Sequence, residues 1–207
     1  MRFRIFTISI IVAAFMFVAA ASHATEIQSI AQQAKQAADA GQTADALGMY
    51  ELVLAQSVNQ PESVFGPLDG QYWQLIVKTD NFPRAFSFFT ALASEQESPS
   101  SDVLSNKANA IGGYLGWLYK NNLGEGLPPE TLKQMDTTAR RDYSRALKLN
   151  PDSFNALYGY AIYESYRPNG HAHMEQLLNR LNSLRSSHPH YPWPLVDYLQ
   201  THGHPQM

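Results

Sequence analysis

The sequence contains no cysteine, and that absence excludes several kinds of chemistry at once. Without thiols the chain cannot form a disulfide, ligate a metal through thiolates, use a cysteine nucleophile or carry a lipid on an N-terminal cysteine. Basic residues are also few, because 15 Lys and Arg stand against 18 Asp and Glu and give a net charge of −3. Nucleic-acid phosphates require clustered Lys and Arg, so this balance argues against a nucleic-acid partner.

The signatures of the common catalytic sites are missing as well. The sequence has no G-x-S-x-G, H-E-x-x-H or G-x-x-x-x-G-K motif, and no G-x-G-x-x-G loop after a strand. The glycines at 112, 113 and 116 lie inside an apolar helical pattern, and Glu125 in the LGEG segment is a lone acid. We therefore expect a protein that is not an enzyme and that needs no cofactor.

The first 24 residues have the pattern of an export signal. Arg2 and Arg4 precede an uncharged apolar run over residues 5–21, and small residues then occupy the two positions that a signal peptidase inspects. We expect cleavage after Ala24, although cleavage after Ala21 fits the same rule. The short charged start is typical of bacterial signals and predicts a periplasmic protein, with full secretion as a second choice. An uncleaved inner-membrane anchor is the alternative, because about 17 apolar residues approach the lower limit for spanning a bilayer.

The remaining chain can build a real core, since 44% of the sequence is hydrophobic and 12% is aromatic. Apolar residues recur at helical spacing throughout it, which predicts an all-α fold. Breaks rich in Pro, Gly and Ser divide the pattern into helix pairs. The predicted units cover residues 26–60, 62–98, 102–150 and 152–187, followed by a short capping helix at 193–201 and a loose tail at 202–207.

One stretch, ending at Glu164, carries the clearest pattern. Ala139, Tyr143, Ala146 and Pro151 follow one another at spacings of four, three and five, and a second apolar helical pattern comes directly after them. This order of small residue, aromatic, small residue and proline resembles the tetratricopeptide repeat. The resemblance implies an α-solenoid of antiparallel helix pairs, in which each pair buries its apolar face against the next.

The same spacing recurs, less clearly, in other segments: Ala46, Tyr50 and Val53; Ala85, Phe89 and Leu92; and, in the order of the family's first helix, Leu115, Gly116 and Tyr119. In such an array we expect the small residues to lie where helices touch and the aromatic ones to fill the space between them.

Turn and capping residues predict where several helices begin and end. Gly41 should end the first helix, and Thr43 should cap the second. Residues 123–129 form a loop, with Pro129 opening a lengthened helix. Asp152 or Ser153 should cap the helix after Pro151. The glycines inside the helix at 102–121 are expected to let a neighbouring helix approach closely.

The resemblance also implies a function, because tetratricopeptide arrays bind proteins or peptides along a concave surface lined by the first helix of each pair. We therefore expect a non-catalytic scaffold or adaptor with a protein or peptide partner in the cell envelope, and no membrane contact beyond the N-terminal segment. Helical phase assigns ten residues to that surface: Lys35, Gln74, Lys78, Trp117, Lys120, Asn121, Asn155, Tyr158, Ile162 and Tyr166.

The histidines suggest an alternative, a protein that binds a metal or small ligand through its C-terminal third. Six of the seven follow residue 170, and the candidate ligands are His188, His190, His202 and His204, in two pairs separated by Pro or Gly. His171 and His173 can chelate only outside a helix, because residues two apart on a helix point about 200° apart. A metal site is not favoured, since no Asp-, Glu- or Cys-rich ligand spacing accompanies the histidines.

Overall fold

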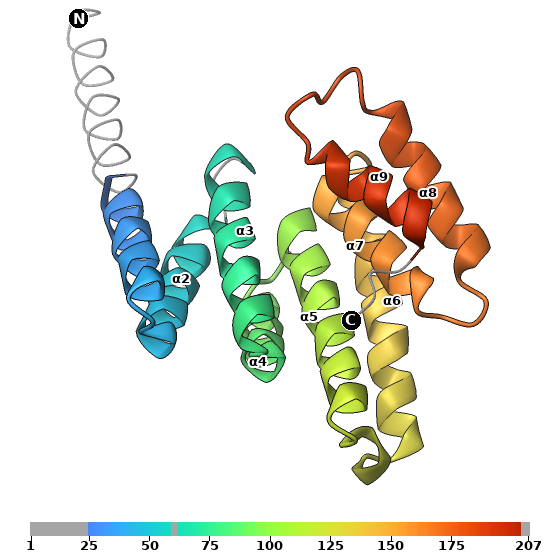
Figure 1. The fold of residues 1–207 in the computed structure, drawn as a ribbon, viewed down its shortest axis with the longest axis horizontal. Coiled ribbons are helices and arrows are strands. Elements are labelled where there is room, and N and C mark those ends of the chain that lie inside the picture. Colours follow the sequence, from blue (N-terminus) through green and yellow to red (C-terminus); the bar gives the residue numbers. More distant parts are fainter. Residues whose placement is uncertain (1–24, 59–61, 204–207) are drawn as a thin grey trace, which may run out of the picture. The chain divides into compact units, whose positions relative to one another are not determined.

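In a computed structural model, residues 25–58 and 62–203 are described, and every regular element within these ranges is a helix (Figure 1). The all-α prediction is therefore confirmed. The predicted signal peptide and both of its cleavage positions lie outside the described residues.

The chain divides into two compact units between Thr79 and Asp80, inside the segment predicted as the second helix pair. The first unit contains a helix at 25–39, α2 (Thr43–Ser57) and α3 (Glu62–Thr79). A turn at Gly41, with φ +76°, ends the first helix as predicted. Two buried tyrosines tie α2 to α3, because each donates a hydrogen bond of 3.1 Å to the other helix: Tyr50 to Gln71 and Tyr72 to Glu51.

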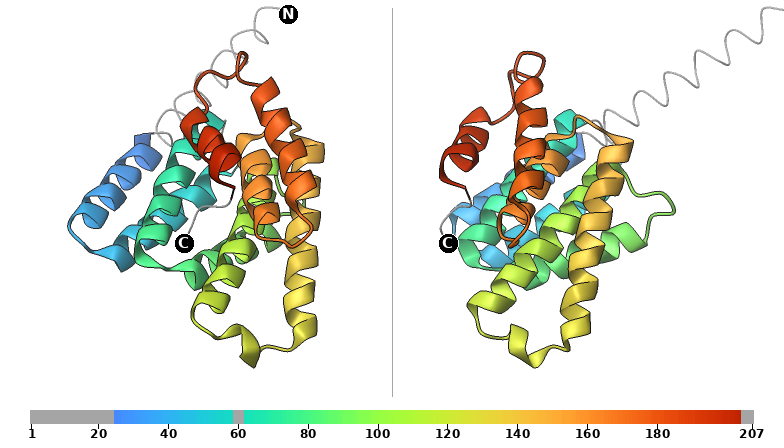
Figure 2. Two further views of the ribbon diagram at one scale, coloured as in Figure 1. Left: turned by 45° about the vertical axis from the view of Figure 1, so that its right-hand side comes forward. Right: turned by 90° about the vertical axis from the view of Figure 1, so that its right-hand side faces the viewer.

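The second unit contains α4 (Phe82–Ser94), α5 (Ser101–Lys120), the 3-10 turn η1 (Gly124–Gly126), α6 (Pro129–Leu149), α7 (Phe154–Ser165), α8 (His171–Ser183) and α9 (Trp193–His202). Helix α5 lies at its centre and packs against α4, α6 and α7. Helix α7 in turn packs against α8, and α8 against α9. Both views in Figure 2 show α5 and α6 side by side, with α8 and α9 following at the C-terminal end of the chain.

Local sequence explains most helix ends. The hydroxyl of Ser153 accepts a hydrogen bond of 3.3 Å from the backbone N–H of Ala156, and Pro129 occupies the first position of α6. Two expectations are wrong. Thr43 is the first helical residue rather than the cap, since Gln42 holds the N-cap position and makes no side-chain capping bond. His202 belongs to α9 and not to the tail.

The small and aromatic residues of the clearest repeat pattern lie in the core. Ala139 and Ala146 are fully buried, and Tyr143 is 1% exposed. The ring of Tyr143 stacks on Tyr160 at 4.7 Å, and its hydroxyl donates a 2.6 Å hydrogen bond to Asn109. Helices α5, α6 and α7 therefore meet around one tyrosine. Burial raises the pKa of that tyrosine well above its ordinary value.

Two of the three glycines of α5, Gly112 and Gly113, make room for rings from neighbouring helices, as expected. A Cβ on Gly112 would lie 2.9 Å from Cδ2 of Tyr163, and a Cβ on Gly113 would lie 2.5 Å from Cδ1 of Phe82. Tyr119 does not follow the repeat pattern. It is 85% exposed, whereas Leu118 beside it is 4% exposed, so the last turn of α5 buries Leu118 and not Tyr119.

The predicted capping helix is present as α9, which covers apolar side chains of the second unit. Val196 and Leu199 are fully buried in the same core cluster as Leu181. The segment that leads into α9 is also fixed, because Tyr191 donates a hydrogen bond of 2.9 Å to the backbone oxygen of Asp152. Trp193 donates one of 3.1 Å to the backbone oxygen of His188.

Candidate functional site

Helices α5 and α7 run in the same direction, and seven of the ten predicted surface residues lie on them or directly after them. A Cβ on Gly159 of α7 would meet Asn109 of α5, and Gly112 of α5 lies against Tyr163 of α7. From the first contact to the second, the position advances from 109 to 112 on α5 and from 159 to 163 on α7, so the two helices are parallel. The C-terminal ends of α5 and α7 thus lie at the same end of the second unit.

Trp117 stands at the end of a row of three aromatic rings, which we call the aromatic ladder. Phe86 of α4 stacks on Tyr114 of α5 at 4.7 Å and 18°, and Tyr114 stacks on Trp117 at 5.9 Å and 19°. All three side chains are partly exposed. The spacing of three between Tyr114 and Trp117 could have indicated this pair from the sequence, but Phe86 joins it only through the packing of α4 on α5.

Two polar residues predicted beside Trp117 have local partners. The ammonium group of Lys120 lies 3.3 Å from a carboxylate oxygen of Asp80, with both side chains largely exposed. The amide of Asn121 donates a hydrogen bond of 2.8 Å to the backbone oxygen of Trp117 and so caps α5. Asn121 therefore stabilises the end of the helix that carries Trp117, and exposed Lys120 remains accessible to a ligand.

The predicted residues of α7 differ in how far they are exposed. Ile162 and Tyr158 are partly buried against the core of the second unit, and the hydroxyl of Tyr158 lies 3.5 Å from the backbone oxygen of Leu195 in α9. Asn155 is also partly buried, whereas Tyr166 is 46% exposed. Burial raises the pKa of both Tyr158 and Tyr166. Tyr166 is thus the most accessible aromatic residue of this set.

The predicted residues of the first unit are Lys35, Gln74 and Lys78, and all three are exposed. Lys35 lies on the helix at 25–39, and the other two lie one turn apart on the outer side of α3. They belong to the first unit and so form a separate set from the α5 and α7 residues, which belong to the second unit.

A polar network centred on Glu164 joins α6, α7 and α8. The buried carboxylate of Glu164 lies 3.1 Å from Nε of Arg140, 3.6 Å from Nε of Arg167 and 3.6 Å from Nδ1 of His173. Arg167 also pairs with Asp136, which accepts a 2.6 Å hydrogen bond from the hydroxyl of Tyr163. These contacts fix the turn after α7.

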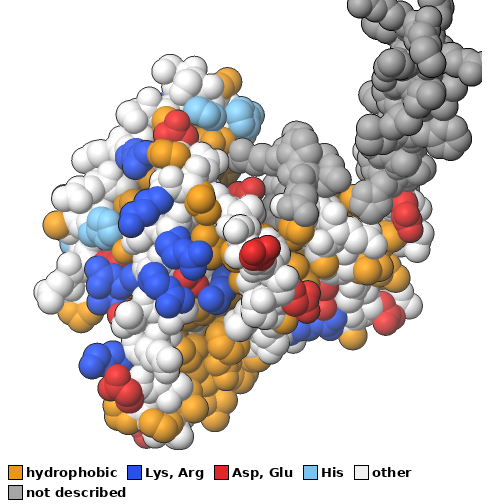
Figure 3. All heavy atoms as spheres, turned by 180° about the vertical axis from the view of Figure 1, so that it is seen from behind, with side chains coloured by type: hydrophobic (Ala, Val, Ile, Leu, Met, Phe, Trp, Pro, Cys, Tyr) orange, Lys and Arg blue, Asp and Glu red, His pale blue; other side chains and the backbone are white. Residues whose placement is uncertain are grey.

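The outer side of α6 carries a concentration of positive charge that the sequence analysis did not single out. We call Lys133, Arg140, Arg141, Arg145 and Lys148 the basic band. Figure 3 shows Lys and Arg side chains gathered on the corresponding face of the molecule, with hydrophobic side chains beside them. A helical-wheel reading of α6 could have found the band, because its residues share one side of the helix.

The histidines do not form a metal centre in the described part of the chain. His171 and His173 both lie in α8, where residues two apart diverge, and His173 packs edge-on against Tyr160. The rings of His188 and His190 are 5.9 Å apart, and Nδ1 of His202 lies 3.1 Å from the backbone oxygen of Tyr198. His204 lies outside the described residues. Within those residues no group of three or more His, Cys, Asp or Glu is placed to hold a metal.

Comparison of the chain with protein-family models, with curated proteins and with solved structures gave no match. In the two described ranges, no helix has both the length and the apolar character needed to cross a bilayer.

Proposed function

We propose that the protein is a non-catalytic adaptor of the bacterial cell envelope, which binds a peptide segment of a partner protein on the second unit. The observation that carries this proposal is the aromatic ladder of Phe86, Tyr114 and Trp117, three stacked and partly exposed rings on a helical scaffold. Aromatic rings dominate many interfaces, because they bury a large area and lose little conformational entropy on binding.

The ladder has the polar surroundings that peptide binding requires. Exposed Lys120 lies one turn beyond Trp117 and can approach a peptide carbonyl or carboxylate. Tyr166, at the C-terminal end of the parallel helix α7, adds a further exposed ring. Lys35, Gln74 and Lys78 belong to the first unit and are not part of the site proposed on the second unit.

The tetratricopeptide-like solenoid is part of the proposal. It is supported by the packing of α5 against α4, α6 and α7. In such an array α4 is the second helix of the preceding pair, α6 is the partner of α5 in its own pair, and α7 is the first helix of the next pair. The solenoid is also supported by the buried small and aromatic residues at the predicted positions, among them Ala85, Phe89, Ala139 and Tyr143. Export through the N-terminal signal would place this array in the periplasm.

Selection from a displayed random-peptide library, using the mature chain as bait, tests the proposal. We expect peptides to be enriched, and calorimetry should show that Trp117→Ala weakens the best of them about 30-fold, as for a central aromatic contact of about 2 kcal/mol. Tyr119→Ala is the matched control, since Tyr119 is 85% exposed and lies outside the ladder. Failure to enrich any peptide, or equal affinity for the wild type and Trp117→Ala, would reject the proposal.

A further inference from the structure

The basic band is unusual in a chain that is acidic as a whole. Helix α6 has 21 residues and holds five of the 15 Lys and Arg of the sequence, whose net charge is −3. The charged groups are accessible: the side chains of Lys133, Arg140, Arg141 and Arg145 are 74%, 45%, 58% and 51% exposed. A local positive surface of this kind attracts anionic partners.

Acidic residues of α6 and its neighbours leave the band with excess positive charge. The buried carboxylate of Asp142 lies 2.8 Å from Lys107, 3.2 Å from Arg141 and 3.9 Å from Arg145, so one negative charge faces three positive ones. This carboxylate is fully buried, so it pairs with the guanidinium groups of Arg141 and Arg145 from below and does not itself reach solvent. The pair of Glu130 and Lys133, at 3.7 Å with both side chains exposed, is weak.

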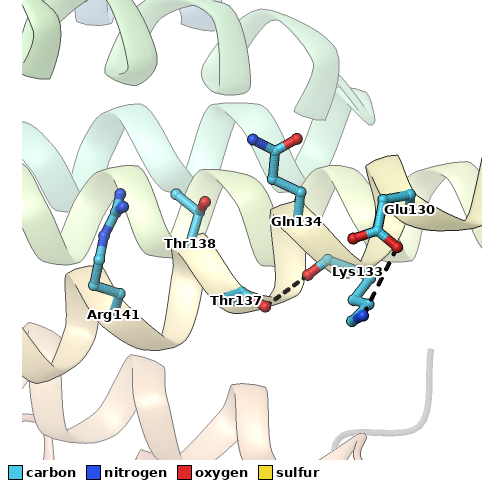
Figure 4. Close-up of a pocket in the computed structure, with 6 residues that line it drawn as sticks. All are labelled: Glu130, Lys133, Gln134, Thr137, Thr138 and Arg141. Atoms are coloured by element: carbon cyan, nitrogen blue, oxygen red, sulfur yellow. Dashed lines mark hydrogen bonds and ion pairs between the residues drawn. The ribbon is translucent and has the colours of Figure 1, made fainter.

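The neutral residues between the first charged residues of α6 are polar. Gln134, Thr137 and Thr138 line a shallow hollow of about 380 Å³ together with Glu130, Lys133 and Arg141, all from successive turns of α6 (Figure 4). A helix that lies on a lipid surface needs large apolar side chains along one side. The lining of this hollow has none, but it offers the hydroxyl of Thr138 and the amide of Gln134 to a polypeptide backbone, whereas the hydroxyl of Thr137 donates to the backbone oxygen of Lys133. The chemistry therefore favours a peptide over a membrane.

The spacing of the cations suits side-chain carboxylates. Along the axis of α6, Lys133 and Arg141 are about 12 Å apart, and Arg141 and Arg145 about 6 Å apart, at about 1.5 Å per residue. Carboxylates on alternate residues of an extended peptide are about 6.6 Å apart and lie on one side of it. Arginine can also bind a carboxylate through two parallel hydrogen bonds. We propose that the basic band of α6 docks an extended acidic peptide segment with Glu or Asp at alternate positions.

This surface is separate from the aromatic ladder on α4 and α5, so the inference does not depend on the proposed function. Fluorescence anisotropy of a labelled peptide that alternates Glu with Ser tests it directly, with the Gln and Ser analogue as the uncharged probe. The mature protein should bind the acidic peptide and not the analogue, and its affinity should fall steadily as salt is added. The triple variant Lys133→Gln, Arg141→Gln, Arg145→Gln should bind at least about tenfold more weakly, as expected when three ion pairs are lost.

The matched control changes the net charge by the same three units at exposed positions on other helices, through Gln32→Glu, Gln36→Glu and Gln176→Glu. It should retain affinity within about twofold of the wild type, because binding depends on the charges of the basic band and not on the total charge of the chain. An equal loss in both variants would overturn the proposal. So would tighter binding to phosphatidylglycerol vesicles or to a single-stranded oligonucleotide than to the acidic peptide.

Circular dichroism establishes that the triple variant is folded. If it has lost helicity, the double variant Lys133→Gln, Lys148→Gln decides, since neither lysine contacts Asp142 in the described structure. A loss of about threefold or more supports the proposal, and unchanged affinity rejects it.

Discussion

Arg140 of α6 and Glu164 of α7 form an ion pair, in which Nε of the arginine lies 3.1 Å from a carboxylate oxygen that belongs to a side chain only 3% exposed. The arginine itself is 45% exposed, so the negative partner is the buried one. Because Glu164 also contacts Arg167 and His173, it joins α6 to α7 and to the start of α8. The helices that position Tyr158 and Tyr166 thus depend on a polar contact in the interior of the second unit.

Arg140→Ala should lower the free energy of unfolding by about 1–2 kcal/mol, since it removes one of three partners from a buried carboxylate. Urea denaturation of the mature chain measures this change. Arg180→Ala is the matched control: Arg180 is 44% exposed, but its partner Asp152 is 54% exposed and 3.8 Å away. That pair should be worth less than about 1 kcal/mol. Equal losses in the two variants would show that burial of Glu164 has no energetic importance.

Gly170→Ala should destabilise the second unit by about 2–4 kcal/mol. A Cβ at this position would overlap the backbone oxygen of Glu164, which cannot move without disturbing the turn between α7 and α8. Gly70→Ala, inside α3, is the control, because no heavy atom lies within 4 Å of its added Cβ. Gly70→Ala should raise the free energy of unfolding by about 0.5–1 kcal/mol. Thermal unfolding compares the two, and a stabilising effect at Gly170 would refute the described turn.

Leu199→Ala should cost about 2–4 kcal/mol, because Leu199 is fully buried and its truncation leaves a cavity between α9 and the core. Leu195 lies one turn earlier on α9 and is 49% exposed, so Leu195→Ala should lower the free energy of unfolding by less than about 1 kcal/mol. The difference in denaturation midpoint measures how firmly α9 caps the second unit. Similar small losses for both variants would show that α9 is not docked.

Alkaline pH should weaken the fold through two tyrosines. The pKa of Tyr143 is raised well above its ordinary value of 10.0 by burial, and that of Tyr163 is raised by burial and by its hydrogen bond to Asp136. Above pH 10 the unfolded chain therefore loses these protons while the folded chain keeps them. Stability is fully present below that pH and falls as pH rises, by up to about 1.4 kcal/mol per pH unit for each tyrosine.

Denaturation at about pH 9 and about pH 11 in the wild type and in Tyr143→Phe measures that contribution. The variant should lose less stability between the two pH values, because it lacks one of the groups that must ionise on unfolding. An identical pH dependence in both proteins would show that Tyr143 is not protected in the folded state.

Much of the helical architecture could be predicted from local sequence, because capping and spacing rules act within a few residues. Ala139, Tyr143 and Ala146 were assigned to helix contacts by spacing alone, and all are buried. Tyr119 shows where such reasoning fails. It has the right neighbours in sequence, but the side of α5 that faces the core is set by α6 and α7, and that side does not include Tyr119.

The candidate sites were less predictable than the fold. Trp117 could be identified from helical phase, but its ring partner Phe86 comes from another helix, and no local pattern joins residues so far apart in sequence. The basic residues of α6 share one side of the helix, which helical phase alone indicates. That Asp142 is buried beneath them, so that the exposed charge is positive, follows only from the packing of the helices.

Site-specific photo-crosslinking tests the central claim, that a partner peptide lies along the C-terminal end of α5, most directly. The sequence has no cysteine, so Lys120→Cys can carry a single benzophenone label beside the aromatic ladder. Glu97→Cys can carry one before the start of α5, a helix of 20 residues that is about 30 Å long. A library-selected peptide should crosslink to the label at position 120 and not to the label at position 97. Equal crosslinking at both positions, or crosslinking at position 97 alone, would contradict the account.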